Sequence, residues 1–335
     1  MRSPRRARGR QLGRAIALCS LVAGSTVAFR APVTAFAAES VRDGDAAIVG
    51  GPRSPSTEIG WRAAVRLLRI APNVDSLRGR SGKLRAVLVS RSNQRIAVLQ
   101  QLFGDSALRS PGVYDVRDSS GAPSFALITM RDFADKLGGS IGAYRIGFWP
   151  AERSAVRSDA YENPEGFIEV TPDNMDTHVS EHFRLRDFLT HDQQEVWPKY
   201  LVLRPQLVDK LELVIAQLQL GGTRVNHLSV MSGFRTPQYN ATGGETGGRA
   251  QLSRHMYGDA ADVFVDNDGD GRMDDLNHDG RIDYRDAQVI LDAVEQVELA
   301  HPDLVGGVGV YRATRSHGPF AHVDVRGNRA RWGLL

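Results

Sequence analysis

Three potential metal ligands lie far apart in this sequence, and they can meet only if the chain folds so that distant segments become neighbours. The segment His255-Met-Tyr-Gly-Asp-Ala-Ala-Asp262 contains a histidine and, seven residues later, an aspartate. The segment His322-Val-Asp324 begins sixty residues after Asp262. Two imidazoles and one carboxylate form a ligand set that a catalytic zinc uses while one position stays open for water. The arrangement therefore indicates a metal-dependent hydrolase.

The local pattern predicts where these residues lie. Asp262 is predicted on a strand over residues 260–265, with His255 on the loop that folds back over it. His322 is predicted on a strand over residues 320–325. Each residue alone is a weak signal, since a single buried histidine is usually satisfied by hydrogen bonds. The combined spacing within the Ser-x-His, Gly-Gly-Val-Gly and His-x-Asp contexts argues against coincidence.

Two further segments, Ser232-Gly-Phe-Arg-Thr-Pro237 and Gly306-Gly-Val-Gly-Val-Tyr311, complete a family resemblance. From about Val179 to the C-terminus the chain resembles the zinc D-alanyl-D-alanine carboxypeptidase family, whose fold is shared with hedgehog and lysostaphin-like peptidases. It is most similar to the murein peptidases that end in a His-x-Asp strand. The resemblance implies an α+β domain over residues 176–335, with a central antiparallel sheet flanked by helices, and a zinc ion on the two histidines and the aspartate.

The resemblance also implies roles for residues around the zinc. Bound zinc would lower the pKa of water toward ~7 and polarise the scissile carbonyl. Arg235 occupies the place of the family's Ser-Gly-Tyr/Phe-Arg arginine, which is expected to hold the substrate carbonyl or the oxyanion. A structural salt bridge is the alternative role. Ser253 and Tyr311 are expected either to line the substrate pocket or to serve as packing residues.

The general base is the point at which the sequence departs from the family pattern. The best-known members place an acid three residues before the last histidine, and this position is Pro319 here. Asp324 lies two residues beyond His322 on the same face of the predicted strand, so it is one candidate for the base. His317 is a second candidate. The alternative role of Asp324 is to orient His322 through a hydrogen bond.

An acidic insertion over residues 266–286 has the ligand spacing of calcium-binding loops, with oxygen ligands at positions one, three, five and twelve and glycine at six. The second loop fits, with Asp286 at position twelve, and resembles a dockerin-type loop. The first is partial, because its twelfth residue, Asn277, also belongs to the second. Acids so close together repel one another without a cation. We expect one or two structural calcium ions on Asp266, Asp268, Asp270, Asp275, Asn277, Asp279, Asp283 and Asp286.

The N-terminus predicts export. Six arginines precede an apolar run from Ala15 to Phe29, and Ala35-Phe-Ala37 offers small residues for cleavage, so residues 1–38 are predicted to be a signal peptide. The apolar run is interrupted and shorter than the about 20 residues that span a bilayer. We therefore expect a periplasmic or secreted protein without stable membrane insertion after cleavage.

The charge of the chain depends strongly on this segment. Residues 1–38 contain seven arginines and no acid, so the formal net charge changes from +3 to −4 without them. No basic stripe remains, and a nucleic-acid partner is therefore not expected. The single cysteine, Cys19, also lies in this segment, so the exported chain would contain neither disulfides nor a thiol nucleophile.

Residues 39–175 are predicted to form a small β-rich domain, with strands near 84–89, 125–129 and 166–171 and short helices near 93–103 and 132–137. Its role is not indicated by its residues. In the second domain, a helix beginning at Pro205, a strand over 228–232 and a helix over 284–298 are predicted, the last one docked by the calcium loops. His178, His182 and His191 match no metal position of the family.

These observations predict a zinc-dependent peptidase that hydrolyses stem-peptide amide bonds of peptidoglycan. It would act as a D,D- or L,D-carboxypeptidase or as an endopeptidase. The alternative is a non-catalytic zinc-containing module that binds cell wall or a protein partner. A third hypothesis, a calcium-dependent adhesion or scaffold protein, rests on the acidic loops alone.

Overall fold

The computed structural model describes residues 48–49, 86–90, 107–117, 123–154, 158–243 and 249–333. The predicted signal peptide and the helix predicted near 93–103 lie outside these residues. All described elements belong to one compact unit within Val41–Leu335. None of the described helices combines the length and apolar character needed to cross a membrane.

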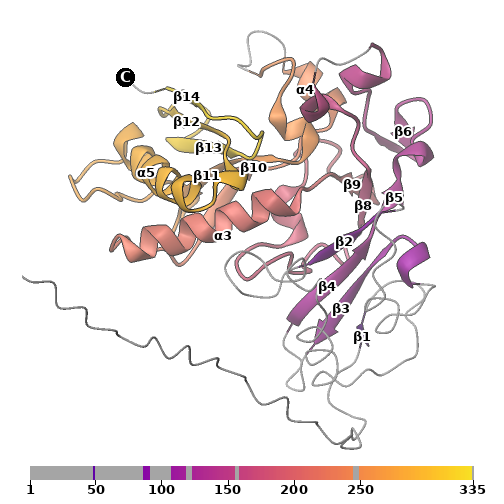
Figure 1. Ribbon diagram of the computed structural model, residues 1–335, viewed down its shortest axis with the longest axis horizontal. Coiled ribbons are helices and arrows are strands. Elements are labelled where there is room, and N and C mark those ends of the chain that lie inside the picture. Colours follow the sequence, from indigo (N-terminus) through magenta and orange to yellow (C-terminus); the bar gives the residue numbers. More distant parts are fainter. Residues whose placement is uncertain are drawn as a thin grey trace, which may run out of the picture. The chain divides into compact units, whose positions relative to one another are not determined.

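A five-stranded sheet forms the centre of the C-terminal half (Figure 1). Its strands, in spatial order, are β10 (Leu228–Ser232), β11 (Ala260–Val265), β13 (Phe320–Asp324), β12 (Gly307–Tyr311) and β14 (Ala330–Trp332). Neighbouring strands are antiparallel except β12 and β14, which are parallel. The predicted strands over 228–232, 260–265 and 320–325 are confirmed, as is the mixed α and β character of the fold.

Two long helices pack against each other and against this sheet. They are α3 (Pro205–Leu220) and α5 (Tyr284–Ala300), and α5 contacts β12 and β13. Proline at the first position of α3 suits a helix start because its missing N–H has no intrahelical partner there. Leu211 and Val214 of α3 are fully buried, as the predicted apolar face requires. Both predicted helices are therefore confirmed, and α5 is two residues longer than expected.

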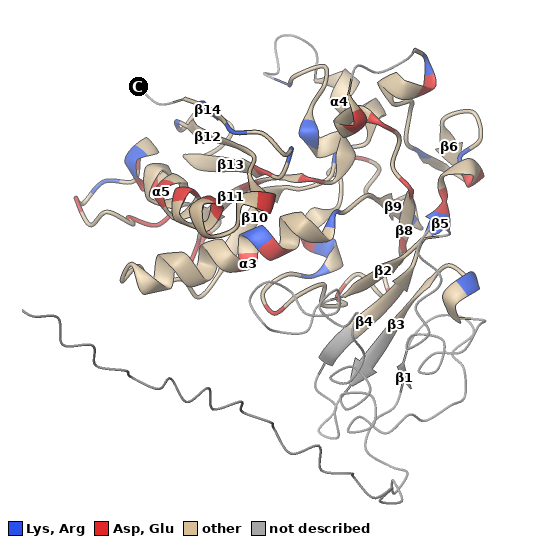
Figure 2. Ribbon diagram, in the orientation of Figure 1, with Lys and Arg blue, Asp and Glu red and all other residues tan. Residues whose placement is uncertain are grey.

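Charged residues are also buried where the two helices pack, and α3 carries both basic and acidic residues (Figure 2). The ammonium group of Lys210 is fully buried and donates to Glu298 of α5 at 2.6 Å and to the backbone oxygen of Asp324 at 2.8 Å. Glu298 also accepts a hydrogen bond from Arg331 at 2.5 Å. Because buried charges require partners, this network ties α3 and α5 to the end of β13.

The described strands of the N-terminal half belong to smaller sheets. They are β1 (Ile48–Val49), β3 (Gly112–Arg117), β4 (Pro123–Thr129) and β2 (Val87–Val89) in one sheet, β5 (Arg131–Asp132), β8 (Gly166–Val170) and β9 (Lys199–Leu201) in a second, and the pair β6 (Ser140–Ile141) and β7 (Tyr144–Arg145). The strands predicted near 84–89, 125–129 and 166–171 are confirmed. The helix predicted near 132–137 is a single 3-10 turn, Phe133–Asp135.

Short helical turns connect these elements. They are η3 (Pro150–Glu152), η4 (Asp159–Tyr161), η5 (Leu185–Phe188), α4 (Pro237–Thr242), η7 (Arg254–Tyr257) and η8 (Pro302–Leu304). One continuous apolar core includes residues from both sides of position 176, among them Trp149 and Phe234. The indole of Trp149 donates to the backbone oxygen of Met256 at 2.8 Å, which anchors η7.

Candidate metal centre

The structure brings His255, Asp262 and His322 together in the C-terminal sheet. Asp262 on β11 and His322 on β13 are direct partners across two neighbouring strands, and His255 lies on η7, just before β11. Their candidate ligand atoms all lie within 4.8 Å of one another. The three residues are 2%, 4% and 7% exposed, in the order His255, Asp262, His322. The residues predicted as ligands therefore form a buried cluster.

Hydrogen bonds on the outer sides of both rings determine which nitrogen faces the centre. Nδ1 of His255 lies 2.7 Å from the backbone oxygen of Gly233, so this nitrogen must carry a proton and donate. Nε2 of His322 lies 3.1 Å from Oδ2 of Asp324 and donates to it in the same way. The inner nitrogens, Nε2 of His255 and Nδ1 of His322, are thereby left with lone pairs toward the centre.

The inner atoms are close to one another. Nε2 of His255 lies 3.2 Å from Nδ1 of His322, and both lie near Oδ1 of Asp262, at 3.2 and 2.9 Å. Two nitrogen lone pairs and a carboxylate oxygen that face one another repel each other. A shared cation would remove this repulsion. The donor set is that of a three-ligand zinc site, so these residues fit zinc.

The electrostatics of His255 and Asp262 favour their ligating forms, whereas those of His322 favour its protonated form. Burial lowers the pKa of His255 despite the charge of Asp262, which favours the neutral, ligating form. Burial acts to raise the pKa of Asp262, but the charges and hydrogen bonds of the two histidines hold that pKa well below its usual range. Burial also acts to lower the pKa of His322, but its bonds to Asp262 and Asp324 raise the pKa overall. Asp262 is therefore an ionised carboxylate.

Asp324 is fully buried and is surrounded by donors. Besides His322, it accepts hydrogen bonds from the backbone N–H of Gly307 at 2.7 Å and from the guanidinium and backbone N–H of Arg326. Burial acts to raise the pKa of Asp324, but the bonds from His322 and Arg326 lower it overall. A carboxylate held in this way is a poor proton acceptor. Its position on the outer side of His322 favours the orienting role over that of general base.

Arg235 also reaches the centre. Its Nη2 donates to Oδ2 of Asp262 at 2.5 Å, and its Nε donates to Oγ of Ser232 at 2.8 Å. This contact is the salt bridge considered as the alternative role of Arg235. It engages the outer oxygen of Asp262 and leaves Oδ1 to face the histidines. Within the described part of the chain, Nη1 of Arg235 has no hydrogen-bond partner, so one donor stays available.

Tyr311 and Trp332 form a wall beside His322. The indole of Trp332 lies 5.2 Å from the imidazole of His322, and its N–H donates to the hydroxyl of Tyr311 at 2.8 Å. Tyr311 stacks on Phe320 at 4.5 Å between ring centroids. Burial raises the pKa of Tyr311, and the nearby charge of Asp262 adds to the effect. Tyr311 therefore keeps its proton at neutral pH.

Trp332 is a site residue that the sequence reasoning missed. The sequence signal for this contact is the glycine at position 309 of the Gly-Gly-Val-Gly segment. A Cβ atom on Gly309 would overlap the indole ring of Trp332. A Cβ on Gly306 would similarly overlap the backbone oxygen of Asp324. These glycines allow Trp332 and the end of β13 to approach β12 closely.

The structure does not bring Ser253 or His317 to the ligand atoms. Ser253 is buried at the start of η7. The imidazole of His317 contacts the backbone oxygen of Gly318 at 2.8 Å and the ring of Phe320 at 5.0 Å. Among the described residues, His317 has no contact with the three ligands.

The acidic insertion forms two loops in which carboxylates accept backbone N–H groups. Asp266 accepts from Gly269 and Gly271, and Asp275 accepts from Asp279 and Gly280. Asp266, Asp268 and Asp274 form a group of oxygens that could hold a metal ion. Sequence reasoning missed Asp274, although it occupies position nine of the first loop.

The end of the insertion is also the start of α5. Asp286 is fully buried and accepts hydrogen bonds from the backbone N–H groups of Leu276 at 2.8 Å and Asp283 at 2.8 Å. Asp283 caps the helix by accepting from Arg285. The two predicted ligands, Asp283 and Asp286, therefore also form the capping box of α5.

A third cluster contains Glu181, His182 and Glu212, none of which was a predicted ligand. Nδ1 of His182 lies 2.7 Å from Oε2 of Glu212, and the backbone N–H of His182 donates to Oε1 of the same carboxylate at 2.9 Å. Both oxygens of Glu212 are thus engaged by one residue, which is typical of a structural ion pair.

No protein-family model, no curated protein and no solved structure matches this chain.

Proposed function

We propose that the protein is a zinc-dependent peptidase that hydrolyses stem-peptide amide bonds of peptidoglycan, as a carboxypeptidase or an endopeptidase. The observation that carries the proposal is the convergence of two imidazole nitrogens and one carboxylate oxygen, each with its other polar atom held from outside. The substrate class comes from the resemblance of the flanking motifs to murein peptidases.

His255, Asp262 and His322 would hold the zinc through Nε2, Oδ1 and Nδ1. When bound, zinc supplies an acidified water and an electrophile for the scissile carbonyl. Gly233 and Asp324 fix the imidazole rings, so little reorganisation is needed when substrate binds. Nη1 of Arg235 and the protonated hydroxyl of Tyr311 would donate hydrogen bonds to the substrate carbonyl oxygen.

The acidic insertion would hold structural calcium. Hard carboxylate oxygens at alternating positions suit calcium better than zinc, and the loops contain no clustered nitrogen ligand. An ion there would fix the segment that begins α5, which packs on β12 and β13. The ligands of the first loop would include Asp274 as well as Asp266 and Asp268.

Digestion of purified peptidoglycan tests the proposal. The zinc-loaded protein and the His255→Ala variant would be incubated with sacculi, and the released muropeptides resolved by mass. Loss of D-alanine or of cross-linked dimers with the native protein alone would support the peptidase and identify the bond.

A non-catalytic zinc module is the second candidate function. It is favoured by one specific observation: Pro319 occupies the family's acid position, and Asp324 is held by Arg326 and His322. A fully zinc-loaded protein that leaves every muropeptide intact would support this module and contradict the peptidase.

A further inference from the structure

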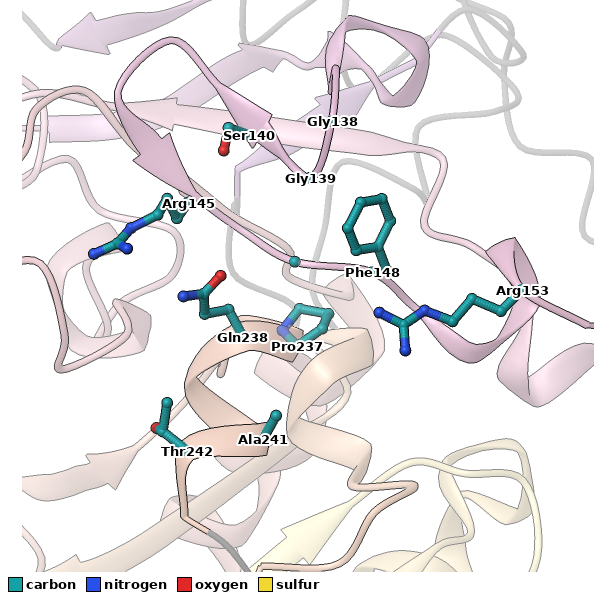
Figure 3. Close-up of a pocket in the computed structure, with 11 residues that line it drawn as sticks. Gly138, Gly139, Ser140, Arg145, Phe148, Arg153, Pro237, Gln238, Ala241 and Thr242 are labelled. Carbon is teal, nitrogen blue, oxygen red and sulfur yellow. The ribbon is translucent and has the colours of Figure 1, made fainter.

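Two adjoining cavities lie between residues 138–154 and helix α4. Their volumes are about 530 and 750 Å³, and both are lined by Phe148, Arg153, Pro237 and Ala241. Figure 3 shows the first cavity, with Arg145 and Gln238 toward one end and Phe148 and Arg153 toward the other. We call the two cavities together the arginine groove. It contains none of the metal-ligand candidates.

The walls of the arginine groove are held by backbone contacts. The N–H of Gln238 donates to the oxygen of Ile146 at 2.9 Å, which joins α4 to the opposite wall. Gly147 has a φ of +86°, and a Cβ there would lie 2.7 Å from the nitrogen of Gln238. A side chain at position 147 would therefore push the walls apart. This close approach makes the groove part of the folded structure rather than a gap between loose segments.

The groove is positively charged. Arg145, Arg153 and Arg249 line it, and none of the described residues of its lining is acidic. None of the three arginines forms a salt bridge with a described residue. The neighbouring carboxylate of Glu152 is already engaged by Lys136 at 2.6 Å and by the backbone N–H of Trp149 at 2.7 Å. The carboxylate of Asp192 interacts electrostatically with Arg145 but forms no salt bridge with it. Guanidinium groups without a salt bridge are suited to bind carboxylates of a ligand.

The groove adjoins the segment that carries one of the ligand candidates. Met256, which lines the second cavity, directly follows the ligand candidate His255 on η7. A chain bound in the second cavity would therefore lie beside the segment that carries His255. Phe148, which is 43% exposed, adds an aromatic surface beside the arginines.

We propose that the arginine groove binds the free carboxylates of peptidoglycan stem peptides and so holds the polymer beside the metal centre. The identity of this ligand rests on the proposed function. Arg145 and Arg153 would be the main contacts, because Arg249 also donates to the backbone oxygen of Tyr239 at 2.7 Å. The groove would select acidic stem peptides over amidated ones.

Co-sedimentation with purified sacculi tests the proposal without hydrolysis. The background is the His255→Ala protein, and the variant is Arg145→Gln/Arg153→Gln. The matched control is Arg184→Gln/Arg224→Gln, which removes the same charge from residues outside the groove. A parallel arm uses sacculi whose carboxylates have been chemically amidated. We expect the groove variant to bind sacculi at least about tenfold more weakly than the parent protein does. We expect a similar weakening when the parent protein binds amidated sacculi.

Equal binding by the groove variant and the control variant would overturn the proposal, and so would undiminished binding to amidated sacculi. The amidation arm needs no substitution and is therefore independent of folding. If the groove variant alone loses binding and the native protein never hydrolyses sacculi, the proposal for the groove stands and only the peptidase is rejected. For an active enzyme, the groove variant should raise KM for sacculi and leave kcat within about twofold.

Discussion

The candidate metal centre and the acidic insertion are neighbours in the sequence but are built in opposite ways. Asp262 and Asp266 are four residues apart, at the middle and just past the end of β11. The centre draws its ligands from η7, β11 and β13, and they are buried. The insertion draws its carboxylates from one continuous stretch that is largely exposed. One site depends on the whole domain, and the other on local spacing.

This difference predicts how each site responds to damage. Removal of a ligand from the centre leaves buried polar atoms without partners, whereas the insertion can lose an ion and still satisfy its carboxylates with backbone N–H groups. The four predictions below test this contrast from the largest expected effect to the smallest.

The largest effect is expected for His255→Ala. The variant should lose stoichiometric zinc and reduce peptidoglycan hydrolysis on the order of a thousandfold or more, because one of three protein ligands is missing. Metal content by mass spectrometry and muropeptide release measure both losses. His227→Ala, which changes an exposed histidine, is the control. Full zinc occupancy in His255→Ala would show that the metal binds elsewhere.

The next effect is expected for Asp324→Asn. If Asp324 orients His322, the amide should weaken zinc affinity by about 10–100-fold, while hydrolysis at saturating zinc largely persists. A competition titration with a chelator measures the affinity. Unchanged affinity combined with abolished hydrolysis would instead identify Asp324 as the general base.

A smaller effect is expected for Asp286→Ala in the insertion. Loss of this buried carboxylate leaves the N–H groups of Leu276 and Asp283 unpaired and removes a helix cap, which should cost about 1–3 kcal/mol. Calcium should raise the melting temperature of the native protein but not of this variant, and zinc content should stay unchanged. Asp292→Ala, an exposed change on the same helix, is the control. Loss of zinc from the Asp286→Ala variant would show that the two sites are not independent.

The smallest effect concerns the ion pair of His182 and Glu212, a cluster of similar composition for which we expect no metal. Burial acts to raise the pKa of Glu212, but the hydrogen bonds from His182 lower it below 4.5 overall. A depressed pKa contributes stability above about pH 4.5, and this contribution is lost as the pH falls through the folded-state pKa.

Glu212→Gln should therefore be less stable than the native protein by about 1–2 kcal/mol at pH 7, with a difference that shrinks below about pH 4. Urea unfolding between pH 3 and 7 measures the difference, with Glu195→Gln as control. A constant difference over this range would contradict the ionised role of Glu212.

Much of the C-terminal half followed from local patterns. The apolar spacing after Pro205 predicted α3, and alternation predicted β10, because periodicity reports which face of an element is buried. The ligand set was found from spacing within motifs. The wall formed by Trp332 was not predicted. Its indole contacts Gly309 of β12 and His322, and these contacts join residues that are distant in the sequence.

The sequence by itself determined the chemical types of the donors, the strands that carry Asp262 and His322, and the oxygen spacing of the insertion, because these depend on residue identity and local period. Only the tertiary structure decided which nitrogen of each histidine faces the centre, since Gly233 and Asp324 set it from other segments. It also decided that Asp324 is enclosed by Gly307 and Arg326, and that Arg145 and Arg153 line one groove with α4. Such properties arise from packing between segments, which no local pattern encodes.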